Sequence, residues 1–148
     1  MAKSTSVEFV GSQVDEAVSS LLRQVRSLGS TPTAGFVFLA GTLARQAVEL
    51  ADALALALPA VPCLVACSSA VLSERREHDQ SSALTGLFWS GGFCLPFGFC
   101  VKETDIDSPI SRIAKVLKKS ETRIHSLGLF LSKEAFLDFS ILDEVEKL

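Results

Sequence analysis

The sequence predicts a single α/β domain with a mixed, mostly parallel sheet. Its 148 residues are about one domain's worth. With 48% apolar and 21% charged residues, its composition is that of a packed globular protein and excludes a disordered chain. Short apolar runs alternate with segments of helical periodicity up to Ser68, which favours β-α-β units and parallel pairing. We therefore expect one domain over residues 1–148, with a βαβαβ front half and a central hairpin.

Three apolar runs are the expected strands of the front half. The first is Val7–Val10, a short run with strand propensity. Gly35–Leu39 and Cys63–Cys67 have no charged or hydroxyl side chain at any position, a pattern typical of strands that are buried on both faces of a sheet. Two helices are expected between these strands.

Apolar residues recur at helical spacing in both connections. The first helix is expected to begin with Ser12 as its N-cap and to end at Gly29. The second begins at Gly41 and Thr42 and continues to Leu58, with many alanines that raise helix propensity.

After the third strand, the polar segment Ser68–Ser82 has little hydrophobic periodicity, so we expect an exposed loop. Ala83–Ser90 and Cys94–Val101 are expected strands, with Gly91 and Gly92 as the turn of a hairpin. Beyond them we expect a helix from Ser108, a strand at Leu127–Leu131 and a terminal helix within Phe136–Leu148.

The charge, hydropathy and cysteine spacing of the chain indicate which partners and which cellular compartment to expect. A net charge of -3 argues against nucleic-acid binding, which leaves a basic footprint. No apolar stretch of about 20 residues is uninterrupted, so no membrane insertion is expected. The four cysteines have C-x3-C and C-x5-C spacings, which do not match common zinc sites. We expect a cytoplasmic protein with no metal, no cofactor and no catalytic activity.

Polar residues follow two of the expected strands where each strand ends. Gly41 and Thr42 stand at a helix start, whose free N–H groups and dipole suit an anion such as a carboxylate. Cys67, Ser68 and Ser69 follow in the same way at the end of the next strand. Open α/β sheets bind ligands at the carboxyl ends of their strands, so these five residues form the candidate ligand-binding site. The alternative is that Thr42 only caps a helix and the serines only end a strand.

A cysteine-nucleophile enzyme is a less favoured interpretation. Ala66–Ala70 resembles the A-C-S-S stretch around the nucleophilic cysteine of ketosynthases, and such an acyl-transfer thiolate needs nearby histidines. Neither His78 nor His125 lies in a recognisable ketosynthase context. We expect Cys67 to be a buried structural thiol and His78 to be solvated in a charged loop.

Protein interaction or scaffolding is the main alternative function. The charged segment 74–80 would form the interface, or else the aromatic side chains around the expected hairpin, which also offer a surface for a homodimer. Those side chains are Phe88, Trp89, Phe93, Phe97 and Phe99.

The order of segments from Val7 to Gly92 resembles the FIST N-terminal domain. The similar features are the helix opening Asp15–Ala17, the strand Ala34–Ala40, the strand and turn Val61–Ser69 and the apolar strand Ala83–Trp89. The family's turn usually has glycine where this chain has Ala66. The resemblance implies a sensory domain of signal transduction that binds a small ligand, with amino acids as suggested ligands. It places Cys67, Ser68 and Ser69 beside the pocket.

Overall fold

A computed structural model describes residues 3–72, 77–78, 81–92, 94, 111 and 114–115. The chain divides into two compact units, Met1–Pro96 and Phe97–Leu148, and every element named below belongs to the first. The single domain expected over residues 1–148 stays a prediction.

Most of the second half of the chain falls outside the described residues. This holds for the strand expected at Cys94–Val101 apart from Cys94, for the strand at Leu127–Leu131 and for the terminal helix. Ser111, Ala114 and Lys115 are helical, in agreement with the helix expected from Ser108.

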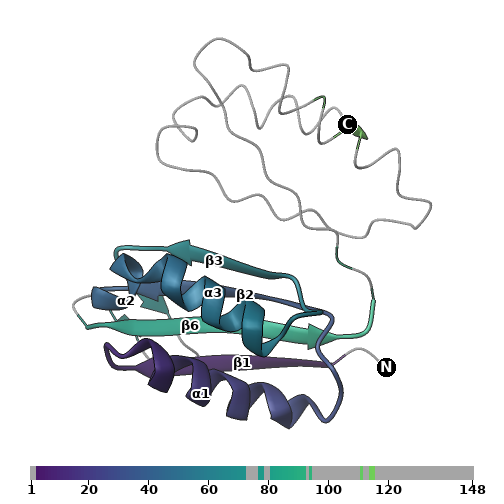
Figure 1. The fold of residues 1–148 in the computed structure, drawn as a ribbon, viewed down its shortest axis with the longest axis horizontal. Helices are drawn as coiled ribbons and strands as arrows, with labels where there is room; N and C mark the ends of the chain where they lie inside the picture. Colours follow the sequence, from purple (N-terminus) through teal and green to yellow (C-terminus); the bar gives the residue numbers. More distant parts are fainter. Residues whose placement is uncertain are drawn as a thin grey trace. The chain divides into compact units, whose positions relative to one another are not determined.

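Four strands form a mixed sheet in the order β1-β6-β2-β3 (Figure 1). The strands are β1 (Lys3–Val10), β2 (Ala34–Ala40), β3 (Cys63–Cys67) and β6 (Ala83–Ser90). β6 pairs antiparallel with both β1 and β2, and β2 pairs parallel with β3. The α/β class and the mixed sheet are confirmed. The expectation of a mostly parallel sheet is not supported, because two of these three pairings are antiparallel.

The position of β6 explains that difference. β1 and β2 run in the same direction with a helix between them, as the alternation of strand and helix predicts. They are not neighbours, however, because β6 lies between them and runs the opposite way. Hydrophobic periodicity indicates strands and the helices that connect them, but not which strands share hydrogen bonds.

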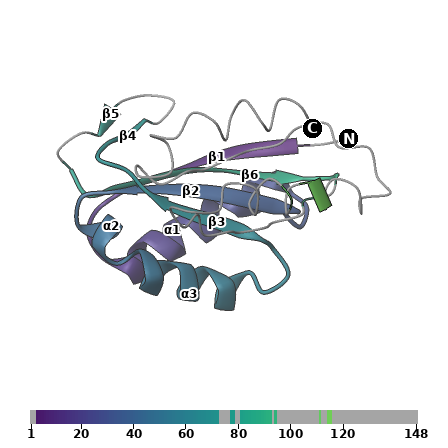
Figure 2. The same ribbon diagram turned by 90° about the horizontal axis from the view of Figure 1, so that it is seen from above.

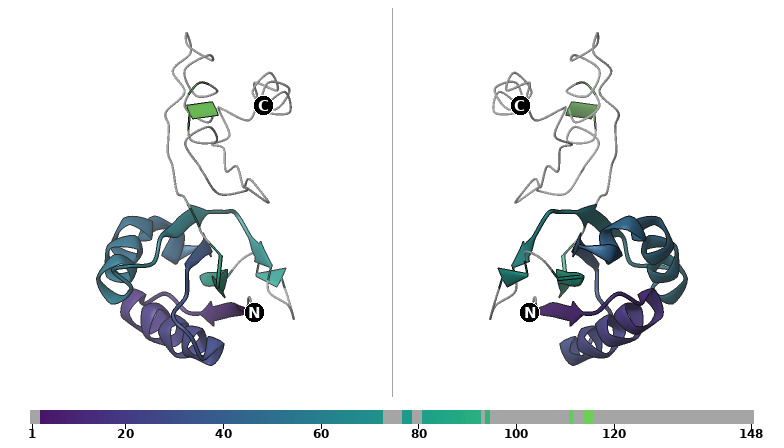
Figure 3. Two further views of the ribbon diagram at one scale, coloured as in Figure 1. Left: turned by 90° about the vertical axis from the view of Figure 1, so that its right-hand side faces the viewer. Right: turned by 90° about the vertical axis from the view of Figure 1, so that its left-hand side faces the viewer.

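The helices cover one face of the sheet (Figures 2 and 3). The N-cap of α1 (Val14–Val25) is Gln13, so the expected N-cap Ser12 is wrong by one residue. The helix runs into a 3-10 turn, Arg26–Leu28, that ends at Gly29 with a left-handed φ of 66°, as predicted. The second expected helix is divided at Gln46 into α2 (Thr42–Arg45) and α3 (Ala47–Ala57). No helix in the described ranges is long and apolar enough to cross a membrane.

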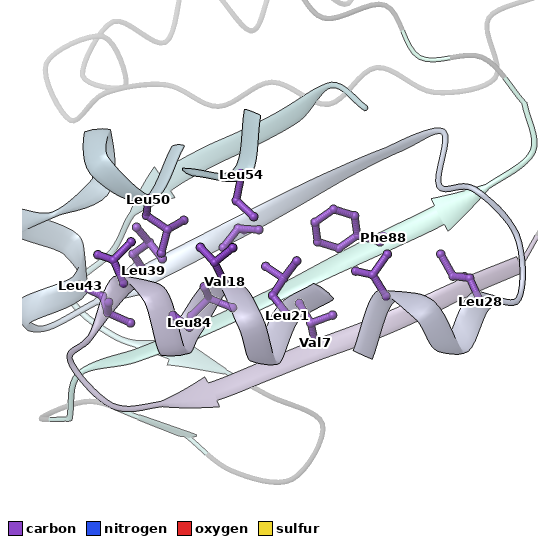
Figure 4. Packing of buried hydrophobic residues seen from close by; sticks show 14 residues of the cluster. Val7, Val18, Leu21, Leu28, Leu39, Leu43, Leu50, Leu54, Leu84 and Phe88 are labelled. Carbon is purple, nitrogen blue, oxygen red and sulfur yellow. The ribbon is translucent and has the colours of Figure 1, made fainter. Parts of the chain in front are cut away.

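The main core lies between this helical layer and the sheet (Figure 4). α1 contributes Val18 and Leu21, α3 contributes Leu50 and Leu54, and β6 contributes the fully buried Phe88. Burial of one such leucine or phenylalanine side chain contributes about 1.5–3 kcal/mol relative to leaving it exposed. The amphipathic face of α1 therefore anchors the helix to the sheet, as its sequence pattern predicts.

A small hairpin lies on the opposite face of the sheet (Figures 2 and 3). It consists of β4 (Val71–Leu72) and β5 (Glu77–His78), which pair antiparallel. Val71 is buried in a second cluster with Ala40 and Ala83. The loop expected at Ser68–Ser82 is therefore wrong for these four residues, and the expected exposure is wrong for Val71 and His78. Strands of two residues are too short for a sequence pattern to reveal them.

β3 differs from its predicted environment. Its apolar sequence predicts burial on both faces, but β3 pairs only with β2 among the described strands, and Leu64 is 40% exposed. A continuous apolar run does not by itself distinguish a central strand from one at an edge.

Gly35 in β2 leaves room for the ring of Phe88. A Cβ atom at Gly35 would lie 2.4 Å from Phe88 Cδ1, and Phe88 is fully buried. We predict that Gly35→Ala lowers the free energy of unfolding by about 1–3 kcal/mol, because the ring has to move within a packed core. Urea unfolding measures this change.

The Phe88→Leu background is the matched control for this substitution. A smaller side chain at residue 88 should reduce the cost of Gly35→Ala, which gives a coupling free energy between the two positions. Equal costs in both backgrounds would contradict the assigned clash.

Candidate functional site

The five predicted site residues gather at one end of the sheet, where β2 and β3 end together beside α2 (Figure 1). Leu39 is opposite Cys67 in the parallel register, and the Ser68 N–H donates a hydrogen bond of 2.8 Å to the Leu39 carbonyl. Gly41, Thr42, Cys67, Ser68 and Ser69 are all exposed. The carboxyl ends of the parallel pair therefore carry two hydroxyl-bearing segments, and ligand binding there stays a prediction.

The Cys67 thiol contacts α2. Its Sγ donates a hydrogen bond of 3.3 Å to the Ala44 carbonyl oxygen. The expectation of a buried structural thiol is wrong, because Cys67 is the last residue of β3 and its side chain is exposed. This contact links the end of β3 to α2, the first helical turn of the segment that connects β2 to β3.

Ser82 occupies the helix start that was predicted to hold an anion. The backbone N–H of Leu43 donates a hydrogen bond of 3.1 Å to the Ser82 side-chain oxygen. One of the N–H groups at the start of α2 is therefore already bonded within the chain, and α2 spans only four residues. Both facts weaken its attraction for an anion, since the helix dipole grows with the number of aligned peptide groups.

The backbone of Ser81 and Ser82 passes directly over Gly41. A Cβ atom at Gly41 would lie 2.8 Å from Ser82 Cα and 3.0 Å from the Ser81 carbonyl oxygen, and Gly41 has a positive φ of 64°. The Ser82 carbonyl also accepts a hydrogen bond of 2.9 Å from the Gly11 N–H. The sequence interpretation missed Ser82, because 39 residues separate it from Leu43 and no local pattern links the two.

His78 is buried next to a carboxylate. Only 6% of the residue is exposed, and its Nε2 lies 2.9 Å from Glu8 Oε1 on β1. Its Nδ1 lies 3.4 Å from the Ser81 hydroxyl oxygen. The expectation of a solvated histidine is therefore wrong. With a neutral ring, these partners assign the proton to Nε2, which donates to Glu8, while Nδ1 accepts from Ser81.

Glu8, His78 and Ser81 have the residue types of a serine–histidine–acid triad. The 3.4 Å between Ser81 Oγ and His78 Nδ1 is longer than the 2.6–3.2 Å over which a general base withdraws a proton. The arrangement therefore fits a structural contact, which orients the imidazole ring, better than it fits a proton relay.

The cysteines differ in their surroundings. Burial raises the pKa of the Cys63 thiol to about 11, and burial also raises the pKa of Cys94. Cys63, Cys67 and Cys94 are free thiols. In the part of the chain that the structure describes, His, Cys, Asp and Glu form no group of three or more that could hold a metal ion.

The chain matches no protein-family model, no curated protein and no solved structure. The resemblance to the FIST N-terminal domain therefore rests on the quoted segments alone.

We predict that Cys67 is alkylated by iodoacetamide far faster than Cys63 at about pH 8. Three pH units below its pKa, only about 0.1% of the Cys63 thiol is ionised, and the thiolate is the nucleophile. The Cys63 rate should rise as the pH approaches about 11, because the thiolate fraction grows with pH below the pKa. Peptide mass spectrometry measures both rates, and comparable rates at the lower pH would contradict this assignment.

Proposed function

We propose that this chain is a sensory domain of signal transduction that binds a small ligand at the carboxyl ends of β2 and β3. The observation that supports this most is the gathering of Thr42, Cys67, Ser68 and Ser69 at the end of a parallel strand pair, all exposed. Ligands of open α/β sheets bind outside the carboxyl ends of such strands. The free thiols are in keeping with a cytoplasmic location, which we also propose.

Amino acids are the ligands that we propose to test first. A hydroxyl group both donates and accepts hydrogen bonds, so the side chains of Thr42, Ser68 and Ser69 suit a ligand that has both a carboxylate and an ammonium group. The short helix start contributes less to anion binding than the sequence predicts, so the hydroxyls must supply most of the recognition.

We predict that at least one common amino acid, at millimolar concentration, raises the melting temperature of the chain. A ligand at about one hundred times its dissociation constant stabilises the native state by about 2.7 kcal/mol, which corresponds to several degrees for a protein of this size. Differential scanning fluorimetry measures the shift.

Two matched variants locate that binding. Thr42→Ala and Ser68→Ala should reduce the ligand-induced shift, and Ser30→Ala should leave it unchanged, because Ser30 precedes β2 at the other end of this strand. If an amino acid raises the melting temperature of both site variants as much as that of the wild-type chain, its binding site lies elsewhere. The absence of a shift with every amino acid would count against the proposal.

A role in protein interaction is the second candidate, and the outer face of α3 favours it. Val48 and Leu56 are 76% and 84% exposed on this helix. The two surfaces that the sequence suggested receive less support. Within segment 74–80 the structure describes only Glu77 and the buried His78, and the described hairpin aromatics are the buried Phe88 and the half-buried Trp89.

We propose a second copy of this chain as the occupant of that face. In an antiparallel pair of α3 helices centred on residue 52, Val48 of one copy lies opposite Leu56 of the other. Paired helices would also bury Val48 and Leu56, which stabilises the pair through the hydrophobic effect.

We predict a dimer of the chain at micromolar concentration that Leu56→Lys converts to a monomer. Sedimentation equilibrium measures the mass. Leu72→Lys is the matched control, because Leu72 is also an exposed leucine but lies in β4, away from α3. A wild-type chain that is monomeric at this concentration, or a dimer that persists in Leu56→Lys, would exclude this interface.

A further inference from the structure

We propose that His78 is a positioning residue for the candidate ligand site. Glu8 on β1 holds the histidine, and the histidine in turn holds Ser81 and Ser82 across the start of α2. This inference rests on the proposed ligand site but concerns its geometry, which is measurable without a ligand.

The first step is the contact between β1 and β5. His78 Nε2 lies 2.9 Å from Glu8 Oε1, 70 residues earlier in the chain. The two-residue strands of the β4–β5 hairpin are too short to be stable alone, so side-chain contacts must fix its place on the sheet. Val71 supplies an apolar contact, and the buried His78 supplies a polar one that has a defined direction.

The second step leads from His78 to the start of β6. The Ser81 hydroxyl lies 3.4 Å from His78 Nδ1, so the ring contacts both β1 and the segment that enters β6. The next residue, Ser82, accepts a hydrogen bond from the Leu43 N–H through its side chain and one from the Gly11 N–H through its carbonyl. Because Gly41 leaves no space for a Cβ beneath Ser82, a displacement of this segment changes the start of α2.

The third step reaches the thiol at the end of β3. Ala44 follows Leu43 in α2, and its carbonyl accepts the hydrogen bond from Cys67 Sγ. A continuous series of contacts therefore runs from Glu8 through His78, Ser82 and α2 to Cys67. The hairpin strand β5, which carries His78, lies on the side of the sheet opposite α1 and α3 (Figures 2 and 3). The histidine therefore acts on the site only through this series of contacts.

Amide hydrogen exchange of Leu43 reports on this geometry, since its N–H donates to Ser82. We expect His78→Ala to increase the exchange rate of the Leu43 amide at least roughly tenfold, while the amide of Val37 in the centre of the sheet changes much less. The alkylation rate of Cys67 should change in the same variant. His78→Gln should restore most of the protection, because the glutamine amide donates to Glu8 and accepts from Ser81.

Two further variants keep the inference testable if His78→Ala fails to fold. Glu8→Ala removes the other partner and should increase Leu43 exchange as well, whereas Leu72→Ala, an exposed position of the same hairpin, should not. Ser82→Ala gives the exchange rate expected when the Leu43 bond is absent.

Unchanged Leu43 exchange in His78→Ala or Glu8→Ala would overturn the positioning role. Equal acceleration at Leu43 and Val37 would also overturn it, since the histidine would then stabilise only the whole fold. Failure of the ligand proposal looks different: Leu43 exchange responds to His78, but no amino acid raises the melting temperature of the wild-type chain.

Discussion

The structure depends on the insertion of β6 between β1 and β2. An antiparallel strand begins where its neighbours end, so the residues that enter β6 must lie at the carboxyl ends of β1 and β2. This constraint places Ser81 and Ser82 over Gly41, next to the first turn of α2. It also carries Phe88 into the centre of the main core, opposite Gly35. The candidate site and the core therefore both depend on the position of β6.

Local pattern predicts much of the fold. Three strands (β2, β3 and β6) and α1 lie close to their expected positions, because each has a distinct apolar pattern. β1 begins at Lys3, four residues before the expected run Val7–Val10, because its first half is polar and gives no apolar signal. The order of the strands in the sheet could not be predicted from local pattern. β1 and β2 run in the same direction, as in a β-α-β unit, whether they are neighbours or are separated by another strand. His78 shows the same limit: a run of charged neighbours suggests solvent, while its partner Glu8 is 70 residues away.

The candidate site was predicted in part. Residues at the ends of β2 and β3 converge because parallel strands end at the same edge, and this follows from the sequence once the pairing is assumed. Local sequence does not show the contribution of Ser82, whose side-chain oxygen accepts the Leu43 N–H from 39 residues away. The sequence predicts free N–H groups at the start of α2 that could bind an anion, but one of them is bonded to Ser82.

The central place of β6 also has a consequence for how the chain acquires its structure during synthesis. β1 and β2 are complete well before β6 leaves the ribosome, and until then each lacks its shared neighbour. A nascent chain that ends before Ala83 presents two unpaired backbone edges beside an apolar core that lacks Leu84 and Phe88, a combination that promotes aggregation. The pairing of β6 with strands far earlier in the chain also predicts slow folding, because the ends of long loops must meet before these contacts form.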